Sequence, residues 1–94
     1  PCSAQEALEW GILNKVCEPD KLMDEALATA RKIAANAPIS IRQAKKSLNM
    51  AAQTDFRNGY VFEIEAYNRM VPTEDRMEGI RAFNEKRKPV YKGQ

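Results

Sequence analysis

The apolar residues of this 94-residue chain recur every three or four positions, in segments that prolines begin or end. That spacing forms one face of an α-helix, whereas a half-buried strand would alternate at every second position. No stretch alternates in this way over a useful length, and no internal repeat is visible. The pattern therefore predicts an all-α fold for residues 1–94, a small domain of four to five short helices.

The first predicted helix has a start signal and a stop signal. Ser3 and Glu6 match a capping box, in which each side chain accepts a hydrogen bond from the other residue's backbone N–H. Gly11 follows the last apolar position and can adopt the left-handed conformation that often ends a helix. We therefore expect a helix over about residues 4–10.

Prolines and polar caps mark the other helices. Proline fits the first turn of a helix, where its missing N–H costs nothing, and it disfavours helical geometry in the residue before it. Thr and Asp side chains cap helix starts. These signals predict four further helices, starting near Pro19, after Pro38, at Thr54 or Asp55, and at Thr73, the last being closed by Lys86, Arg87, Lys88 and Pro89.

The fourth predicted helix is apolar over more than one stripe. Its large apolar residues are Phe56, Tyr60, Val61, Phe62, Ile64 and Tyr67. The other helices of so small a chain cannot cover all of them. A helix of this kind is typical of burial against another domain or subunit, so we expect self-association.

Composition excludes several classes of protein. The chain has no histidine, which removes Ser-His-Asp and Cys-His catalysis and His-ligated zinc. No apolar run approaches the roughly 20 residues of a membrane span, and a net charge of +2 disfavours a nucleic-acid binder. We expect no metal, no membrane and no nucleic acid among its partners.

Two cysteines are too few for a disulfide framework or a four-cysteine metal site. Cys2 and Cys17 are expected to be reduced thiols of a cytoplasmic protein. A single disulfide and a reactive thiol are the alternatives.

The charge of the chain is concentrated at its end. The last fourteen residues hold five bases and one acid. Such a segment is either a solvated, positively charged terminus or a binding site for something phosphorylated.

Carboxylates are the remaining candidates for acid–base chemistry. Glu63 and Glu65 lie two positions apart and so point in different directions on a helix. Glu74, Asp75 and Glu78 gather at a helix start, where the helix dipole stabilises acids. We predict no catalytic residue in this chain.

The last third of the chain carries a long, ungapped signature. Thr73-Glu74-Asp75-Arg76, Glu78-Gly79, Ala82-Phe83 and Glu85-Lys86-Arg87-Lys88-Pro89 together resemble the C-terminal signature of the enoyl-CoA hydratase/isomerase (crotonase) family. The resemblance extends upstream and covers essentially the whole chain, through Ser3-Ala4, Glu6-Ala7, Gly11-Ile12-Leu13-Asn14 with Val16, Ala37-Pro38 with Ala44-Lys45, and Gly59 with Glu63.

The resemblance implies the C-terminal (oligomerisation) part of a crotonase-type α/β enzyme. Family members place their oxyanion hole and catalytic glutamates in an N-terminal spiral, which this chain would lack. The complete enzyme would be a lyase of fatty acid metabolism that adds water across the 2,3 double bond of an acyl-CoA thioester. It would assemble as a trimer or hexamer, and the fragment alone would be inactive.

One pair of site residues follows from the resemblance. Phe83 and Lys86 match positions that contact the adenine end of coenzyme A bound to a neighbouring subunit. No covalently bound cofactor is expected, only the CoA thioester substrate. An aromatic ring can stack on adenine and an ammonium can pair with a phosphate. Positions three apart share one helical face. Arg87 and Lys88 would add general attraction for phosphates.

Alternatives stay open for the site residues and for the whole chain. Phe83 could instead be a core anchor, with Lys86 a solvated terminal charge. For the whole chain, the alternatives are another acyl-CoA enzyme of the family (an isomerase, dehydratase or hydrolase) and a free-standing helical oligomerisation module. The residues that would set the reaction type and the acyl chain specificity are not in this sequence.

Overall fold

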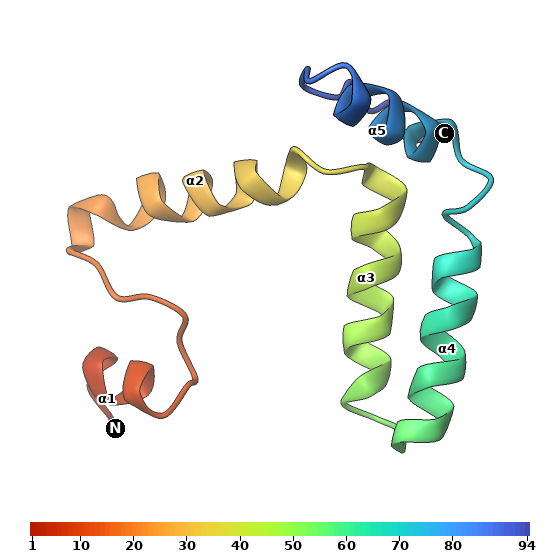
Figure 1. The fold of residues 1–94 in the computed structure, drawn as a ribbon. Coiled ribbons are helices and arrows are strands. Elements are labelled where there is room, and N and C mark those ends of the chain that lie inside the picture. The colour runs from red at the N-terminus through yellow and green to blue at the C-terminus, as the bar shows by residue number, and fades with distance from the viewer. The chain divides into compact units, whose positions relative to one another are not determined.

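A computed structural model describes residues 1–94 and consists of helices joined by turns (Figure 1). The elements are α1 (Ala4–Glu9), the 3-10 helix η1 (Pro19–Lys21), α2 (Leu22–Ala34), α3 (Pro38–Ala51), α4 (Phe56–Asn68) and α5 (Glu74–Asn84). There is no strand, so the predicted all-α fold class is confirmed. No helix combines the length and the apolar character needed to cross a membrane.

The chain divides into two compact units, residues 1–31 and residues 32–94. In the first unit, α1 begins with the predicted capping box. The Glu6 N–H donates to Ser3 Oγ at 3.2 Å, and the Ser3 N–H donates to the Glu6 carboxylate at 2.8 Å. The Ser3 N–H, together with the Ser3 hydroxyl that donates to the same carboxylate, holds the pKa of Glu6 below its usual value. A local exchange of two hydrogen bonds thus fixes where α1 starts.

The end of α1 is a Schellman turn. Gly11 is in the left-handed region with φ 74°. Its N–H donates to the Leu8 carbonyl at 3.0 Å, and the Ile12 N–H donates to the Ala7 carbonyl at 2.9 Å. This pair of bonds satisfies carbonyls that would otherwise lack a partner at the helix end. Glycine serves here because it has no Cβ to clash in this conformation.

In the second unit, α3 and α4 pack side by side (Figure 1). α3 begins at Pro38 itself, which occupies the first turn, whereas the sequence predicted a start after Pro38. Of the two possible caps for α4, Asp55 is the one used, since its carboxylate accepts from the Asn58 N–H at 3.0 Å. Ala66 of α4 is buried. The small side chain lets the two helix axes approach each other.

The apolar face predicted on α4 is largely uncovered in this chain. Phe56 is 89% exposed, and its ring stacks on that of Tyr60 with centroids 6.4 Å apart. Val61, Ile64 and Tyr67 are also exposed, whereas Phe62 is half-buried. The buried apolar residues of the whole chain are three alanines: Ala7, Ala66 and Ala82. The two units therefore have little hydrophobic core of their own.

Thr73 caps α5 as predicted, accepting from the Arg76 N–H at 3.2 Å. The end of α5 differs from the sequence prediction. The helix stops at Asn84, with Glu85 as its C-terminal cap, before the basic segment begins. Lys86 has φ 56° and cannot continue a right-handed helix. The residues after it run back along α5 instead of extending it.

Candidate functional site

The C-terminal tail, residues 87–94, is tied to the start of α5 by a buried carboxylate. Asp75 is 3% exposed. Its two oxygens accept the N–H groups of Lys92 at 2.7 Å and Gly93 at 2.8 Å. The Asp75 N–H donates in turn to the Gln94 carbonyl at 3.1 Å. A buried carboxylate needs such partners, because burial without hydrogen bonds would be costly.

One turn further along α5, Glu78 makes a second attachment. Its carboxylate receives two N–H groups of the Arg87 guanidinium, at 2.6 and 2.9 Å, and the Val90 N–H at 2.9 Å. The Arg87 hydrogen bonds, followed by that of Val90, lower the pKa of Glu78 from 4.5 to about 2. The same pairing raises the pKa of Arg87. Both groups stay charged across the range in which proteins normally work.

These contacts give two acids a role that the sequence analysis missed. Helix-dipole stabilisation accounts for Glu74, which is exposed in the first turn of α5. Asp75 and Glu78 instead anchor the tail. Their spacing of three was the available signal, since it places both carboxylates on one face of the helix. Nothing in the spacing, however, indicates that the tail returns to that face.

The end of α5 is a second Schellman turn, with Lys86 in the place that Gly11 has after α1. The Lys86 N–H donates to the Phe83 carbonyl at 3.3 Å, and the Arg87 N–H donates to the Ala82 carbonyl at 3.0 Å. Lys86 is the one residue other than glycine with a positive φ. Its backbone is therefore held in a conformation that a residue with a Cβ normally avoids.

The turn brings the two predicted site residues together. The Lys86 ammonium lies 4.5 Å from the centroid of the Phe83 ring, which is a cation–π contact. The prediction that the two share one helical face is wrong, because Lys86 lies beyond the helix and reaches the ring through its left-handed backbone. Phe83 is 74% exposed, so within this chain it is not a core anchor. The pair presents an aromatic surface and a positive charge to solvent.

The two other basic residues of the predicted phosphate-attracting segment differ from each other. Arg87 is held by Glu78 and also donates to the Glu85 carboxylate at 2.5 Å. Its guanidinium is thus engaged within the chain. Lys88 is exposed. Of these two residues, Lys88 is therefore the one whose charge is more open to a bound anion.

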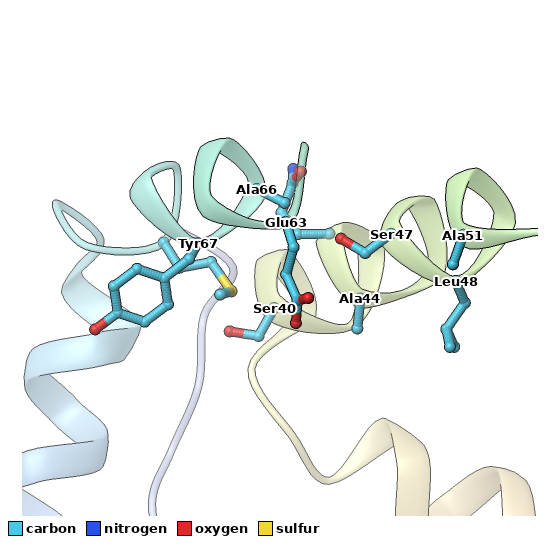
Figure 2. A pocket seen from close by; sticks show the side chains of 10 residues that line it. Ser40, Ala44, Ser47, Leu48, Ala51, Glu63, Ala66 and Tyr67 are labelled. Atoms are coloured by element: carbon cyan, nitrogen blue, oxygen red, sulfur yellow. The ribbon is translucent and has the colours of Figure 1, made fainter. Parts of the chain in front are cut away.

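The carboxylates Glu63 and Glu65 do not line the same hollow. Glu63 extends from α4 into a hollow of about 510 Å³ between α3 and α4, beside Ser40 and Ala44 (Figure 2). Glu65 lies beside a different hollow, with Gln43 on its lining. A paired acid–base arrangement of the two is therefore absent. Cys2 is exposed and Cys17 half-buried, and both are free thiols.

Solved structures share this helical arrangement. The crystal structure of an enoyl-CoA hydratase from Bacillus anthracis superposes with a TM-score of 0.93 at 43% sequence identity, over 97% of this chain and 35% of that one. An enoyl-CoA hydratase/isomerase from Mycobacterium paratuberculosis gives a TM-score of 0.92 at 30% identity, over 98% and 36%. The fold is therefore that of the C-terminal helical part of crotonase-type enzymes.

Sequence comparison gives the same answer at family level. A family model described as enoyl-CoA hydratase/isomerase matches residues 1–94, and the chain belongs to that family. The short-chain-enoyl-CoA hydratase of Clostridium acetobutylicum is 42% identical over 85 residues, which are 90% of this chain and 33% of that protein. YngF of Bacillus subtilis is 46% identical over 91 residues, which are 97% and 35%. The chain thus spans about a third of the length of these relatives.

Proposed function

We propose that this chain is the CoA-contacting and assembly region of an enoyl-CoA hydratase. The complete protein would be a cytoplasmic lyase that adds water across the 2,3 double bond of an acyl-CoA thioester. The names of the relatives support the reaction, since the Bacillus anthracis structure and the Clostridium protein are both enoyl-CoA hydratases. The catalytic groups would lie in the part of the enzyme that this chain does not include, so the chain alone would not turn over substrate.

The observation that carries the CoA contact is the exposed Phe83–Lys86 pair at the end of α5. The Phe83 ring offers a face on which the adenine of CoA stacks. The Lys86 ammonium neutralises a CoA phosphate. Both interactions involve the nucleotide end of the molecule, far from the thioester carbons that react. They therefore bind the ground state and the transition state alike, which lowers KM and leaves kcat unchanged.

This contact is tested by substitution in the full-length protein. Phe83→Ala should cost about 1–3 kcal/mol of stacking, and Lys86→Ala about 1 kcal/mol because the lysine is exposed. Both losses should appear in KM for an enoyl-CoA and vanish for the matching enoyl-pantetheine, which lacks the nucleotide. The Lys86 effect should also shrink with added salt, as screened charge pairs do. An equal loss for the two substrates would mean that the residues serve folding or assembly instead.

Self-association is the second part of the proposal, and it rests on the uncovered face of α4. Phe56, Tyr60, Val61, Ile64 and Tyr67 are more than two-fifths exposed. Leaving several such side chains in water forfeits several kcal/mol, at roughly 25 cal/mol per Å² of apolar surface. We expect the full-length protein to sediment as a trimer or hexamer, and Phe56→Ser with Tyr60→Ser to shift it toward smaller species. A wild-type monomer at high micromolar concentration would contradict this.

A related reaction is the alternative. The carnitinyl-CoA dehydratase of Salmonella agona is 37% identical over 95 residues, so relatives of different reaction type share this region. Identification of the product that the full-length protein forms from an enoyl-CoA separates a hydratase from an isomerase or hydrolase. A free-standing oligomerisation module would bind no CoA at all.

A further inference from the structure

Glu78 is bonded to two residues that follow Lys86 in the chain, Arg87 and Val90. Arg87 follows Lys86 directly, and its guanidinium is paired with both oxygens of the Glu78 carboxylate. The Val90 N–H donates to the same carboxylate. The Glu78 side chain is 14% exposed, and the Arg87 side chain that it holds is 40% exposed. Glu78 therefore fixes the direction in which the chain leaves Lys86.

Lys86 is held from its other side by the last turn of α5, through its bond to the Phe83 carbonyl. A lysine in the left-handed region is disfavoured relative to other conformations, so it stays there only where the surrounding structure imposes it. The left-handed backbone is what lets a side chain outside the helix reach the Phe83 ring at 4.5 Å. Releasing the Arg87 side chain from Glu78 leaves that backbone held at this turn mainly by the two Schellman bonds.

We propose that Glu78 is a positioning residue for coenzyme A binding: by holding Arg87 and Val90 it keeps Lys86 in the left-handed conformation that places its ammonium beside Phe83. This inference rests on the function proposed above for Phe83 and Lys86. Glu78 itself does not touch the ligand. Its negative charge would disfavour an anionic ligand if charge were its only effect.

The charge of Glu78 and its positioning of Lys86 should have opposite effects on CoA binding, which makes the inference testable. Removing the negative charge of Glu78 should, by electrostatics alone, strengthen the binding of the CoA phosphates. Loss of positioning should weaken it. A Glu78→Gln variant that binds CoA more weakly therefore reports positioning and not charge.

The experiment measures the dissociation constant of CoA by titration calorimetry on the full-length protein. The variants are Glu78→Gln, Lys86→Ala, these two combined, Phe83→Ala, and Glu85→Gln as the matched control. Glu85 also contacts Arg87, but it bonds to no backbone N–H of the tail and its side chain is 57% exposed. We expect Glu78→Gln to weaken CoA binding about two- to fivefold, the range of one exposed charge pair. Glu85→Gln should leave binding unchanged or slightly tighter.

The double variant decides how Glu78 acts. If Glu78 works through Lys86, adding Glu78→Gln to Lys86→Ala should weaken CoA binding no further, and the lost negative charge should leave it unchanged or slightly tighter. A further loss in the double variant, or unchanged or tighter binding with Glu78→Gln alone, overturns the positioning role. The proposed function fails separately, if the wild type does not bind CoA or if Lys86→Ala and Phe83→Ala both bind it as the wild type does. Should Glu78→Gln not fold, Arg87→Lys keeps the charge, loses the two-pronged pair and is expected to weaken binding likewise.

Discussion

The ends of α1 and α5 make the same turn with different residues. Both close with a Schellman pair of backbone hydrogen bonds, and both place a residue in the left-handed region immediately after the cap. After α1 that residue is Gly11, for which the conformation costs nothing. After α5 it is Lys86, for which the conformation is unfavourable.

The chain beyond Lys86 explains why a lysine can stand there. Asp75 and Glu78 together accept four hydrogen-bonding partners from the tail: Lys92, Gly93, Val90 and Arg87. Contacts of this kind can impose a conformation that the local sequence would not choose. At the end of α5 the backbone of Lys86 is therefore held in an unfavourable conformation. That conformation places the Lys86 ammonium beside the exposed Phe83 ring.

The largest effect is expected from the buried anchor. Asp75→Ala should leave the Lys92 and Gly93 amides without their carboxylate, at a cost of about 2–3 kcal/mol to the local stability of the tail. Hydrogen exchange of these two amides in the full-length protein should then accelerate about 30- to 160-fold. If the tail opens and Lys86 nevertheless keeps its left-handed conformation, the tail contacts are not what holds Lys86 in that conformation.

The control for this change is Glu74→Ala. It removes the same charge from the same first turn of α5, so it alters the interaction with the helix dipole equally. Glu74 is exposed and makes none of the tail bonds of Asp75. Equal acceleration in both variants would show that the dipole, and not the anchoring bonds, stabilises this end of the molecule.

Helix starts could be predicted from sequence because their causes are local. Ser3, Asp55 and Thr73 each bond to the amide three residues ahead, within a single turn. A reader of the sequence needs only a short window to recognise such a pair. The same window also yields the helical period, and with it the fold class.

The end of α5 and the tail could not be predicted in this way. The bonds of Asp75 and Glu78 join residues 9 to 18 positions apart. No glycine marks Lys86 as a left-handed position, so the basic run looked like a continuing helix end. The family resemblance predicts the pairing of Phe83 with Lys86, but a shared helical face is the wrong geometry for it, because Lys86 lies beyond the helix.

Acid should weaken the attachment of the C-terminal tail to α5. The pKa of Glu78 is lowered to about 2, so its bonds stabilise the folded tail fully above its ordinary pKa of 4.5. That stabilisation is lost as pH falls from 4.5 toward 2, where the carboxylate gains a proton. We expect the Val90 amide to lose protection from hydrogen exchange over this range. The loss should be smaller than the loss that Asp75→Ala causes at its own two amides, because Arg87 remains near the protonated carboxyl group.

The matched variant for this titration is Glu78→Gln, in which the pH dependence of Val90 protection should flatten. Glu6 and Asp55 also have lowered pKa values, from their own capping bonds, and weaken other helix starts in acid. The difference between wild type and Glu78→Gln removes those contributions. An unchanged acid profile in the variant would mean that Glu78 does not hold the tail.

The smallest effect is expected from a direct comparison of the two turns, in which glycine is compared with alanine at position 11 and at position 86. Gly11→Ala should destabilise the end of α1 by about 1 kcal/mol, all of it conformational, because an added Cβ would meet no atom within 4 Å. At the second turn, Lys86→Gly should be about 1 kcal/mol more stable than Lys86→Ala, since both lack the ammonium and only glycine relieves the strain. Amide exchange at Ile12 and Arg87 measures the two differences.

Equal values would show that the turns carry the same backbone cost. A vanishing difference at position 86 would mean that Lys86 is not left-handed in solution. Lys86→Gly should also bind CoA no better than Lys86→Ala, because what the strained backbone supplies is the position of the charge.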